Sequence, residues 1–422
     1  MANAVGSKAS SGDGVDVQEQ RSGYRYWVLV LAFLGIMVTF IDRVNLSVAA
    51  PLITKQMHMS HAEMGVVLST FFWSYTILQI PSGYLIDRLG IRKTFTGMFW
   101  FWGIFSALTA AAGTPFGLGL VRGGLGVAES PMYPGLIPFL KRWFHERERA
   151  LMMGIIGMGL PVGSFVGAAL SGALIAAYGW RLMFIVTGIL SALVGILWWV
   201  TYRDKQKAGN PKAPSTPFSG GMRRLLQERN VWALTIGYFG SNYSLYLFLT
   251  WLPTYFVLHF HFSILKSGIF TGLVFLAGLV GKPFVGWISG RILAKGYSLT
   301  AARKWVLVPT AVLGTSMVLA AIIHNAVLAA IFLAIAEAFS TAGGSMCWAT
   351  GADIAPLNAA GQVGGIMNTA AGLGGIVAPI VTGILLTMTH SFMGPLLVAA
   401  VIQVGAGLSY GLLLGRVQTI TA

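Results

Sequence analysis

The chain has 422 residues, of which 55% are hydrophobic and only 10% are charged. A soluble domain carries about 25% charged residues, so this composition argues against a water-soluble protein and indicates a membrane protein. The net charge of +15 could indicate a nucleic-acid-binding protein, but the distribution of the basic residues along the chain does not fit that class.

Residues 1–22 are polar and rich in Ser and Gly, which predicts a disordered cytoplasmic tail rather than a signal peptide. Twelve apolar segments follow, each long enough to cross about 30 Å of hydrocarbon as a helix. These predicted spans are 26–50, 63–84, 94–112, 116–140, 150–176, 181–201, 231–257, 267–289, 304–324, 326–350, 361–388 and 391–414. The sequence therefore predicts an all-α membrane protein with twelve transmembrane helices.

The basic residues are divided unevenly between the two sides of these spans. Of the 28 Lys and Arg residues, 22 lie in the tails and in the connections that follow even-numbered spans, three lie in the other connections, and three lie inside spans. This positive-inside pattern predicts a multi-pass inner (plasma) membrane protein with both termini in the cytoplasm. The basic charge is explained by topology, and no nucleic-acid partner is expected.

A polar segment near the midpoint of the chain separates six spans from six. A glycine pattern also repeats at a constant offset of 211 residues, at Gly154, Gly163, Gly172, Gly365, Gly374 and Gly383. The repeat predicts two pseudo-symmetric six-helix bundles with a binding site between them. The predicted parts are a tail over 1–22, a first bundle over 23–201, a cytoplasmic linker over 202–230 with a short helix over 222–227, a second bundle over 231–415, and a cytoplasmic tail over 416–422.

The connection between spans two and three reads GYLIDRLGIRK and contains Gly83, Asp87 and Arg88. It resembles the cytoplasmic loop signature of the major facilitator superfamily, G-x-x-x-D-R-x-G followed by basic residues, although Ile91 replaces the first of these. Asp87 could cap a helix end and pair with bases of a neighbouring helix, so the motif would act as a conformational latch. In the alternative, the basic residues only anchor the cytoplasmic side.

Four ionisable residues lie at membrane depth in spans one and four: Asp42, Arg43, Arg122 and Glu129. A charge at this depth costs at least about 2.5–3.5 kcal/mol, so it persists when it is paired, hydrated or functional. Asp42 and Arg43 project about 100° apart, so one can face a cavity while the other meets span four. Because a nearby arginine changes the proton affinity of a carboxyl group, movement of an arginine would couple proton binding to transport. The alternative is two buried ion pairs that fix helix register.

Several segments in combination resemble the anion:cation symporter family, which includes bacterial sugar-acid transporters and vesicular glutamate and sialic acid carriers. They are Asp42-Arg43, VRGGLGVAESPMYPG around Arg122 and Glu129, Trp143-Phe144 with Glu148-Arg149-Ala150, and the stretch from Asn242 to Tyr255. The resemblance runs from about residue 24 to residue 415. It implies proton-coupled uptake of an organic carboxylate by alternating access.

By this resemblance, Arg43 matches the arginine that holds the substrate carboxylate, Asp42 and Glu129 match protonation sites, and Arg122 matches the arginine that links them. Other positions match the family's substrate cavity, with interhelical hydrogen bonding as the alternative role: Tyr75, Asn242, Tyr243, Ser345, Trp348 and Asn368. Leu160 stands where sugar-acid members have a glutamine, so a less hydroxylated or aromatic carboxylate is as compatible as a sugar acid.

Three further residues have less certain roles in the sequence. Lys282 is expected to extend its ammonium group toward the cytoplasmic side, and Trp251 to lie in the outer interface belt. Glu337 has no obvious basic partner, and it is either a protonated packing group or a gate. The histidines fall near the outer ends of spans, and no metal site is expected.

These observations favour a proton-coupled symporter of a small organic anion that needs no cofactor beyond protons and works as a monomer in the bilayer. An organic-anion uniporter or exchanger with permanently paired acids remains the alternative. An enzyme is disfavoured because the sequence offers no nucleophile–base set, metal-ligand cluster or nucleotide loop. A receptor is disfavoured because there is no sizeable soluble sensing domain.

Overall fold

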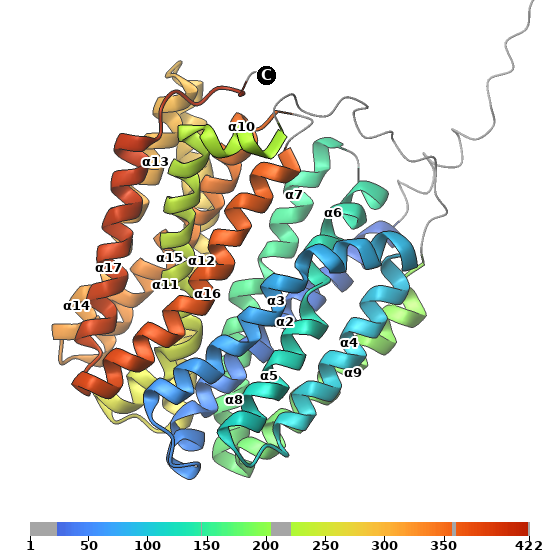
Figure 1. Ribbon diagram of the computed structural model, residues 1–422, viewed down its shortest axis with the longest axis vertical. Coiled ribbons are helices and arrows are strands. Elements are labelled where there is room, and N and C mark those ends of the chain that lie inside the picture. The colour runs from blue at the N-terminus through green and yellow to red at the C-terminus, as the bar shows by residue number, and fades with distance from the viewer. Residues whose placement is uncertain (1–22, 145, 204–220, 357–359, 421–422) are drawn as a thin grey trace, which may run out of the picture.

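The computed structural model describes residues 23–144, 146–203, 221–356 and 360–420, and its regular elements in this part of the chain are helices (Figure 1). The predicted tail over 1–22 and most of the 202–230 linker lie outside the described residues. The short helix predicted over 222–227 is present as α10 (Gly221–Gln227).

The helices form two groups that lie side by side (Figure 1). The first group contains α2 (Tyr24–Gln56), α3 (His61–Leu89), α4 (Ile91–Thr109), α5 (Pro115–Glu129), α6 (Met132–Trp143), α7 (Glu146–Gly157), α8 (Gly159–Tyr178) and α9 (Trp180–Thr201). The second contains α11 (Arg229–Phe260), α12 (Ile264–Ala294), α13 (Leu299–Gly314), α14 (Met317–Ile322), α15 (Ala326–Ile354), α16 (Ala360–Thr389), α17 (Met393–Leu408) and the π-helical turn η1 (Ser409–Leu413). We call these groups the first half and the second half.

Every predicted span corresponds to a helix or a pair of helices. By length and composition, eight of the described helical segments could cross a membrane. The other predicted spans are present as α3, α4, α11 and the pair α5–α6. The fourth predicted span is divided because Pro131 has no amide hydrogen with which to continue α5. The predicted fold class, a helical membrane protein, is confirmed.

Two close backbone contacts of similar geometry join the halves. A Cβ atom added at Gly65 of α3 would lie 2.5 Å from the carbonyl oxygen of Pro379 in α16, and one added at Gly268 of α12 would lie 2.4 Å from the carbonyl oxygen of Ala168 in α8. Residue 379 follows residue 168 by 211 positions, the offset of the glycine pattern, whereas Gly268 follows Gly65 by 203. At each contact the backbones approach so closely that only glycine fits.

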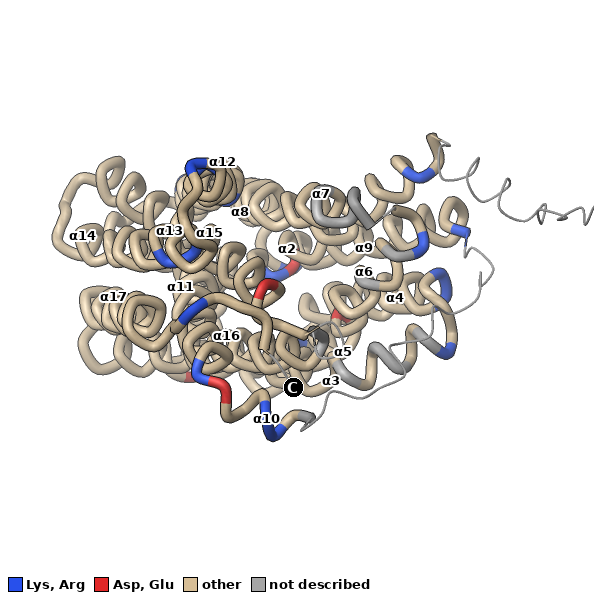
Figure 2. The backbone as a smooth tube through the Cα atoms, turned by 90° about the horizontal axis from the view of Figure 1, so that it is seen from above, with Lys and Arg blue, Asp and Glu red and all other residues tan. Residues whose placement is uncertain are grey.

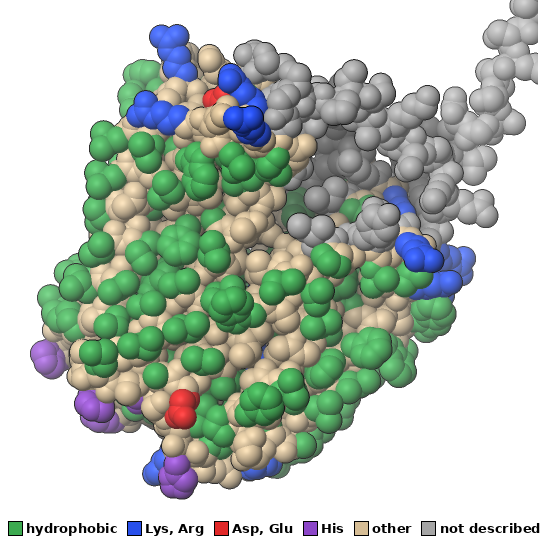
Figure 3. Space-filling view, viewed as in Figure 1, with side chains coloured by type: hydrophobic (Ala, Val, Ile, Leu, Met, Phe, Trp, Pro, Cys, Tyr) green, Lys and Arg blue, Asp and Glu red, His purple; other side chains and the backbone are tan. Residues whose placement is uncertain are grey.

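The two ends of the bundle differ in charge (Figure 3). Figure 2 shows Lys and Arg at the periphery of one end, with further charged residues inside the bundle near α2. We call this the basic end; its described residues include Arg88, Arg92, Lys93, Arg223, Arg224, Arg291, Lys295, Arg303 and Lys304. We call the opposite end the histidine end; it carries His58, His61, His259, His261, His324 and His390. The glycine contacts near the first turns of α3 and α12 close the histidine end.

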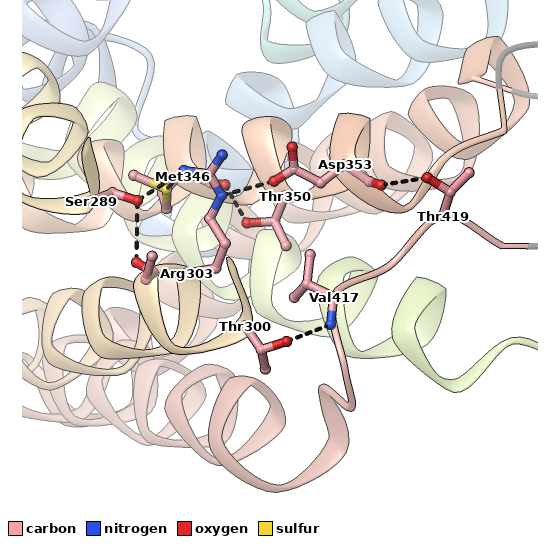
Figure 4. Close-up of polar contacts among 9 residues, drawn as sticks. Ser289, Thr300, Arg303, Met346, Thr350, Asp353, Val417 and Thr419 are labelled. Carbon is pink, nitrogen blue, oxygen red and sulfur yellow. Dashed lines mark hydrogen bonds and ion pairs between the residues drawn. The ribbon is translucent and has the colours of Figure 1, made fainter. Parts of the chain in front are cut away.

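An ion pair joins three helices of the second half at the basic end (Figure 4). The Nε atom of Arg303 in α13 lies 2.8 Å from Oδ2 of Asp353 in α15, and its Nη1 atom donates to the hydroxyl of Ser289 in α12 at 2.8 Å. Both members of the ion pair are partly exposed, so it is a weak stabiliser that fixes geometry more than it adds free energy.

The C-terminal segment crosses the same end of the second half (Figure 4). The amide of Val417 donates to the hydroxyl of Thr300 at 2.9 Å, and the amide of Ile420 donates to the carbonyl of Ile354 at 2.9 Å. Residues 416–420, predicted as a tail, are therefore held against the ends of α13 and α15.

Candidate transport site

Asp42 occupies the middle of α2, and its carboxylate is fully buried within the first half. It accepts hydrogen bonds from Nδ2 of Asn45 at 2.8 Å and from the hydroxyls of Ser106 in α4 and Ser191 in α9, both at 2.9 Å. The hydroxyl of Thr187 lies 3.2 Å from both Asn45 and Ser106. The carboxylate therefore faces α4 and α9, and neutral donors satisfy it.

Arg43 points in another direction and forms an ion pair. Its Nε atom lies 3.2 Å from Oε2 of Glu129, and both side chains are buried. The guanidinium carbon lies 5.0, 4.9 and 4.7 Å from the ring centroids of Phe40, Phe71 and Tyr75, within the range of cation–π attraction. Arg43 is thus held by one acid and by the faces of three aromatic rings.

The Arg43–Glu129 pair is incomplete on both sides. Nη2 of Arg43 and Oε1 of Glu129 are buried without a hydrogen-bond partner. Guanidinium and carboxylate groups commonly meet through two parallel hydrogen bonds, and here only one is made. Arg43 therefore keeps an unused donor that an incoming carboxylate or sulfonate could occupy.

Local structure places Glu129 at this position. Glu129 is the last residue of α5, immediately before the helix is interrupted at Ser130 and Pro131. One turn earlier, a Cβ atom added at Gly126 would lie 2.2 Å from the carbonyl oxygen of Phe71, so glycine allows α5 to approach the backbone of α3. This approach brings Glu129 close to the aromatic rings that surround Arg43.

Arg122 lies between the two acids without an ion pair to Asp42 or Glu129 among the described residues. Its Nη1 atom donates to the backbone carbonyl of Asp42 at 3.3 Å, its guanidinium lies 5.7 Å from the ring of Phe71, and its Nε atom has no hydrogen-bond partner. The alternative of two buried ion pairs is therefore not what the structure shows, since one pair is formed and Asp42 and Arg122 are joined through main chain.

The site continues across the boundary between the halves through Tyr246 of α11, which sequence reasoning missed. Its ring centroid lies 4.5 Å from that of Phe72, and its hydroxyl interacts with Arg43, as does that of Tyr75. Arg43 is therefore placed where a helix of the second half meets the first half.

The predicted cavity residues fall into different environments. Asn368 of α16 donates to Oε1 of Gln79 in α3 at 2.5 Å, which joins the halves. Ser345 and Trp348 of α15 are exposed, and Trp348 packs edge-on against Tyr238 with centroids 5.9 Å apart. Contact of these three residues with a ligand stays a prediction.

The other two predicted positions in the second half are enclosed. Asn242 donates to the carbonyl of Tyr238 at 2.9 Å. Tyr243 is fully buried, with its hydroxyl unpartnered, and packs against Phe239. In this conformation Tyr243 is therefore not open to a ligand.

The predicted latch is described only in part. Arg88 is exposed at the end of α3, at the basic end of the bundle. Gly83 and the side chain of Asp87 are not among the residues whose surroundings the structure describes, so the latch stays a prediction.

A spacing of four residues could have identified some of the missed residues. Tyr238, Asn242 and Tyr246 recur at this interval on α11, and Tyr75 and Gln79 do so on α3. Residues at this interval share one face of a helix, so a polar stripe in an apolar span indicates a cavity wall. By contrast, nothing in the sequence of α4 or α9 assigns Ser106 and Ser191 to Asp42.

The prediction for Trp251 is wrong. Its side chain is 1% exposed and donates to the carbonyl of Pro379 at 3.2 Å, inside the contact between α11 and α16. Lys282 is partly exposed, and the direction in which its ammonium group extends stays a prediction. Glu337 does have a basic neighbour, and that neighbour is Lys282.

Comparison with known proteins agrees with this architecture. Residues 32–379 match the family model described as Major Facilitator Superfamily. The chain belongs to the major facilitator superfamily. It is therefore a membrane transporter and not an enzyme, and the superfamily resemblance of the 83–93 segment is confirmed.

Curated relatives match over nearly their whole length. The chain is 30% identical to the D-galactonate transporter of Escherichia coli O6:H1, over 94% of this chain and 97% of that protein. It is 32% identical to the "Probable sulfoacetate transporter SauU" of Cupriavidus necator, over 92% and 94% of the two chains. It is 30% identical to the "Probable galactarate/D-glucarate transporter GudP" of Escherichia coli K12, over 95% and 96%.

A solved structure shares the fold. A bacterial homologue of the human lysosomal transporter Spinster, in an inward-facing and occupied conformation, superposes with a TM-score of 0.77 over 93% of this chain and 97% of that chain. The sequence identity is 17%, so the similarity concerns the fold alone.

Proposed function

We propose that this transporter is a proton-coupled symporter of a small organic anion, acting as a monomer. The observation that carries the proposal is the buried Arg43–Glu129 pair, in which each partner keeps one unsatisfied polar atom. Relatives named for D-galactonate and sulfoacetate transport support an organic acid as substrate.

The pair allows Arg43 to exchange one acidic partner, Glu129, for another, the substrate. When Glu129 binds a proton it loses its charge, and the attraction that holds Arg43 to it becomes a weaker neutral hydrogen bond. Arg43 can then direct its guanidinium to the acidic group of the substrate. When Glu129 releases the proton, its carboxylate competes for Arg43 and displaces the substrate, so proton and substrate move together.

Asp42 and Arg122 extend this exchange to a second acid. Arg122 contacts the main chain of Asp42 and faces the ring of Phe71, which also lies against Arg43. Movement of Arg43 would therefore shift Arg122, and through Arg122 the main chain of Asp42, because these groups are packed together. We assign protonation to Asp42 and Glu129, and coupling between them to Arg122.

The conformation supports alternating access. The halves are in backbone contact at the histidine end, whereas Ser345 and Trp348 on α15 remain exposed nearer the basic end. With the basic end in the cytoplasm, as the positive-inside pattern predicts, this arrangement is an inward-open state of a plasma membrane protein whose termini are both cytoplasmic.

The test is uptake into proteoliposomes containing the full chain. An inward proton gradient should drive uptake by the wild type, whereas Asp42→Asn and Glu129→Gln should abolish gradient-driven uptake and leave counterflow. Glu228→Gln, which removes a carboxylate at the protein surface, is the matched control and should behave as the wild type.

One observation favours a second candidate, a uniporter or exchanger. Asp42 is completely hydrogen-bonded and has no access to solvent in this state, as expected of a permanently ionised structural group. Wild-type uptake that ignores the proton gradient, with the acid variants unimpaired in exchange, would establish this candidate instead.

A further inference from the structure

Lys282 lies on the face of α12 that points away from lipid. The most exposed large side chains of this helix are Leu273, Val280, Phe284 and Trp287, with exposed fractions between 45% and 71%. At about 100° per residue, Lys282 projects about 180° from Leu273 and about 160° from both Val280 and Phe284. Since Lys282 is nevertheless partly exposed, its access to solvent comes from the interior of the transporter.

A close helix crossing places Glu337 beside this lysine. A Cβ atom added at Gly281 of α12 would lie 2.5 Å from the carbonyl oxygen of Ala338 in α15, so the two backbones touch at this point. Lys282 and Glu337 are the sequence neighbours of these two residues. The two opposite charges, on different helices, interact at this crossing.

The two groups are close but do not satisfy one another. Glu337 is 1% exposed, and its Oε2 atom has no hydrogen-bond partner. Among the described residues, no ion pair within 4.0 Å joins Glu337 to Lys282. An ammonium group on an interior face, partly solvated and without a tight partner, has donors free for an anion.

The crossing adjoins the route between the halves. One turn before Lys282, a Cβ atom added at Gly278 would lie 3.5 Å from the hydroxyl of Thr341 and 3.8 Å from Pro161 of α8, in the first half. Spacings of four, four and three residues place four side chains of α15 on one face, and the last two of them are exposed: Glu337, Thr341, Ser345 and Trp348.

We propose that Lys282 is a second anion-binding group of the transport site, and that the transported anion carries two acidic groups, one held by Arg43 and the other by Lys282. This inference rests on the proposed function and names its substrate class. Without substrate, Glu129 neighbours Arg43 and Glu337 neighbours Lys282. A dianion that spans the halves replaces both acids as the counter-ion, and it binds the closed state better than a monoanion because it contacts both halves at once.

The experiment compares matched anions that differ by one acidic group. Purified full-length protein is titrated with D-glucarate against D-gluconate, succinate against butyrate, and sulfoacetate against methanesulfonate, and affinities are measured by calorimetry and thermal shift. The wild type should bind at least one dianion more tightly than its monoanionic partner. Lys282→Met should lower the affinity for that dianion by at least about tenfold and change the affinity for the monoanion by less than about threefold.

Two variants separate binding from folding. Lys282→Arg keeps the positive charge and should keep the preference for the dianion, whereas Lys282→Met combined with Glu337→Gln removes both charges and should fold while lacking the preference. Lys295→Met, which removes an exposed lysine at the basic end, controls for net charge.

Several results would overturn the inference. The first is a Lys282→Met variant that loses affinity equally for both members of each anion pair, and the second is a variant with an unchanged preference for the dianion. The third is a wild type that no dianion of the panel stabilises. Each would show that the Lys282–Glu337 pair only joins α12 to α15. The binding measurement uses no proton gradient, so its failure is distinguishable from failure of proton coupling, which only the uptake assay reports.

Discussion

The two halves share a backbone plan but differ in where they place charge. The first half holds Asp42, Arg43, Arg122 and Glu129 in its core, whereas the second half has Lys282 and Glu337 at one helix crossing. A shift of 211 residues carries position 129 to position 340, one helical turn from Glu337. By this offset each half contributes an acid at a similar position along the chain, whereas four of the six charged residues named here belong to the first half.

A neutral hydrogen-bond network joins three helices of the second half. Gln403 of α17 donates to the hydroxyls of Ser340 at 2.6 Å and Ser244 at 3.0 Å, and so joins three helices. Asp42 joins three helices in the same way, but as an acceptor that can bind a proton. The comparison teaches that one scaffold supports a buried carboxylate centre in one half and a neutral amide centre in the other.

The largest expected effect comes from Arg43. Arg43→Met should reduce uptake to background, because it removes the guanidinium that we propose binds the substrate and leaves Glu129 buried alone, at a cost of about 3–5 kcal/mol in stability. Lys282→Met should instead retain uptake of a monoanion. Proteoliposome uptake by both variants, with Arg43→Lys as a folded control, checks the difference. Equal impairment of the two would contradict the unequal division of roles.

The next effect concerns the glycine contacts at the histidine end. Gly65→Ala and Gly268→Ala each place a Cβ within 2.5 Å of a main-chain carbonyl oxygen, so each should shift the population toward opening at this end. With Cys347→Ser as background, a cysteine at Thr387, whose hydroxyl accepts from the amide of Ala62, should react with a membrane-impermeant thiol reagent about tenfold faster.

The control for this experiment is Gly97→Ala, since a Cβ at that position meets nothing within 4 Å. If only one of the two variants at the histidine end changed the labelling rate, the contacts would not be functionally equivalent and the pseudo-symmetry would be structural only.

The smallest expected effect is in the neutral centre. Gln403→Leu leaves the hydroxyls of Ser340 and Ser244 without their donor and should lower the free energy of unfolding by about 1–3 kcal/mol. Uptake by Gln403→Leu should depend on the proton gradient as uptake by the wild type does, unlike uptake by Asp42→Asn. Thermal unfolding and uptake at two gradients measure both quantities; an altered gradient dependence in Gln403→Leu would place proton exchange in the second half as well.

Much of the fold follows from the sequence because the bilayer imposes simple constraints. Long apolar segments must be helices, and basic residues and the 211-residue repeat mark the sides and the halves. Boundaries were less predictable: span four was expected to be continuous, although Pro131 divides it. Trp251 was misplaced because hydropathy reports depth and not which face of a helix meets protein.

The site was predictable only in its charged residues. A charge in an apolar span is visible in sequence, so Asp42, Arg43 and Glu129 stand out. Their partners were not, because Ser106 and Ser191 are ordinary small residues of transmembrane helices, and only packing brings them to Asp42. The direction in which Lys282 projects likewise depends on which face of α12 the other helices cover.

The glycine contacts at Gly65 and Gly268 also bear on the membrane potential that drives a proton-coupled carrier. With backbone against backbone, these two positions leave no space for water between the helices that meet there. A leak there would dissipate the gradient without moving cargo. Two glycines therefore help to seal the histidine end against such a leak.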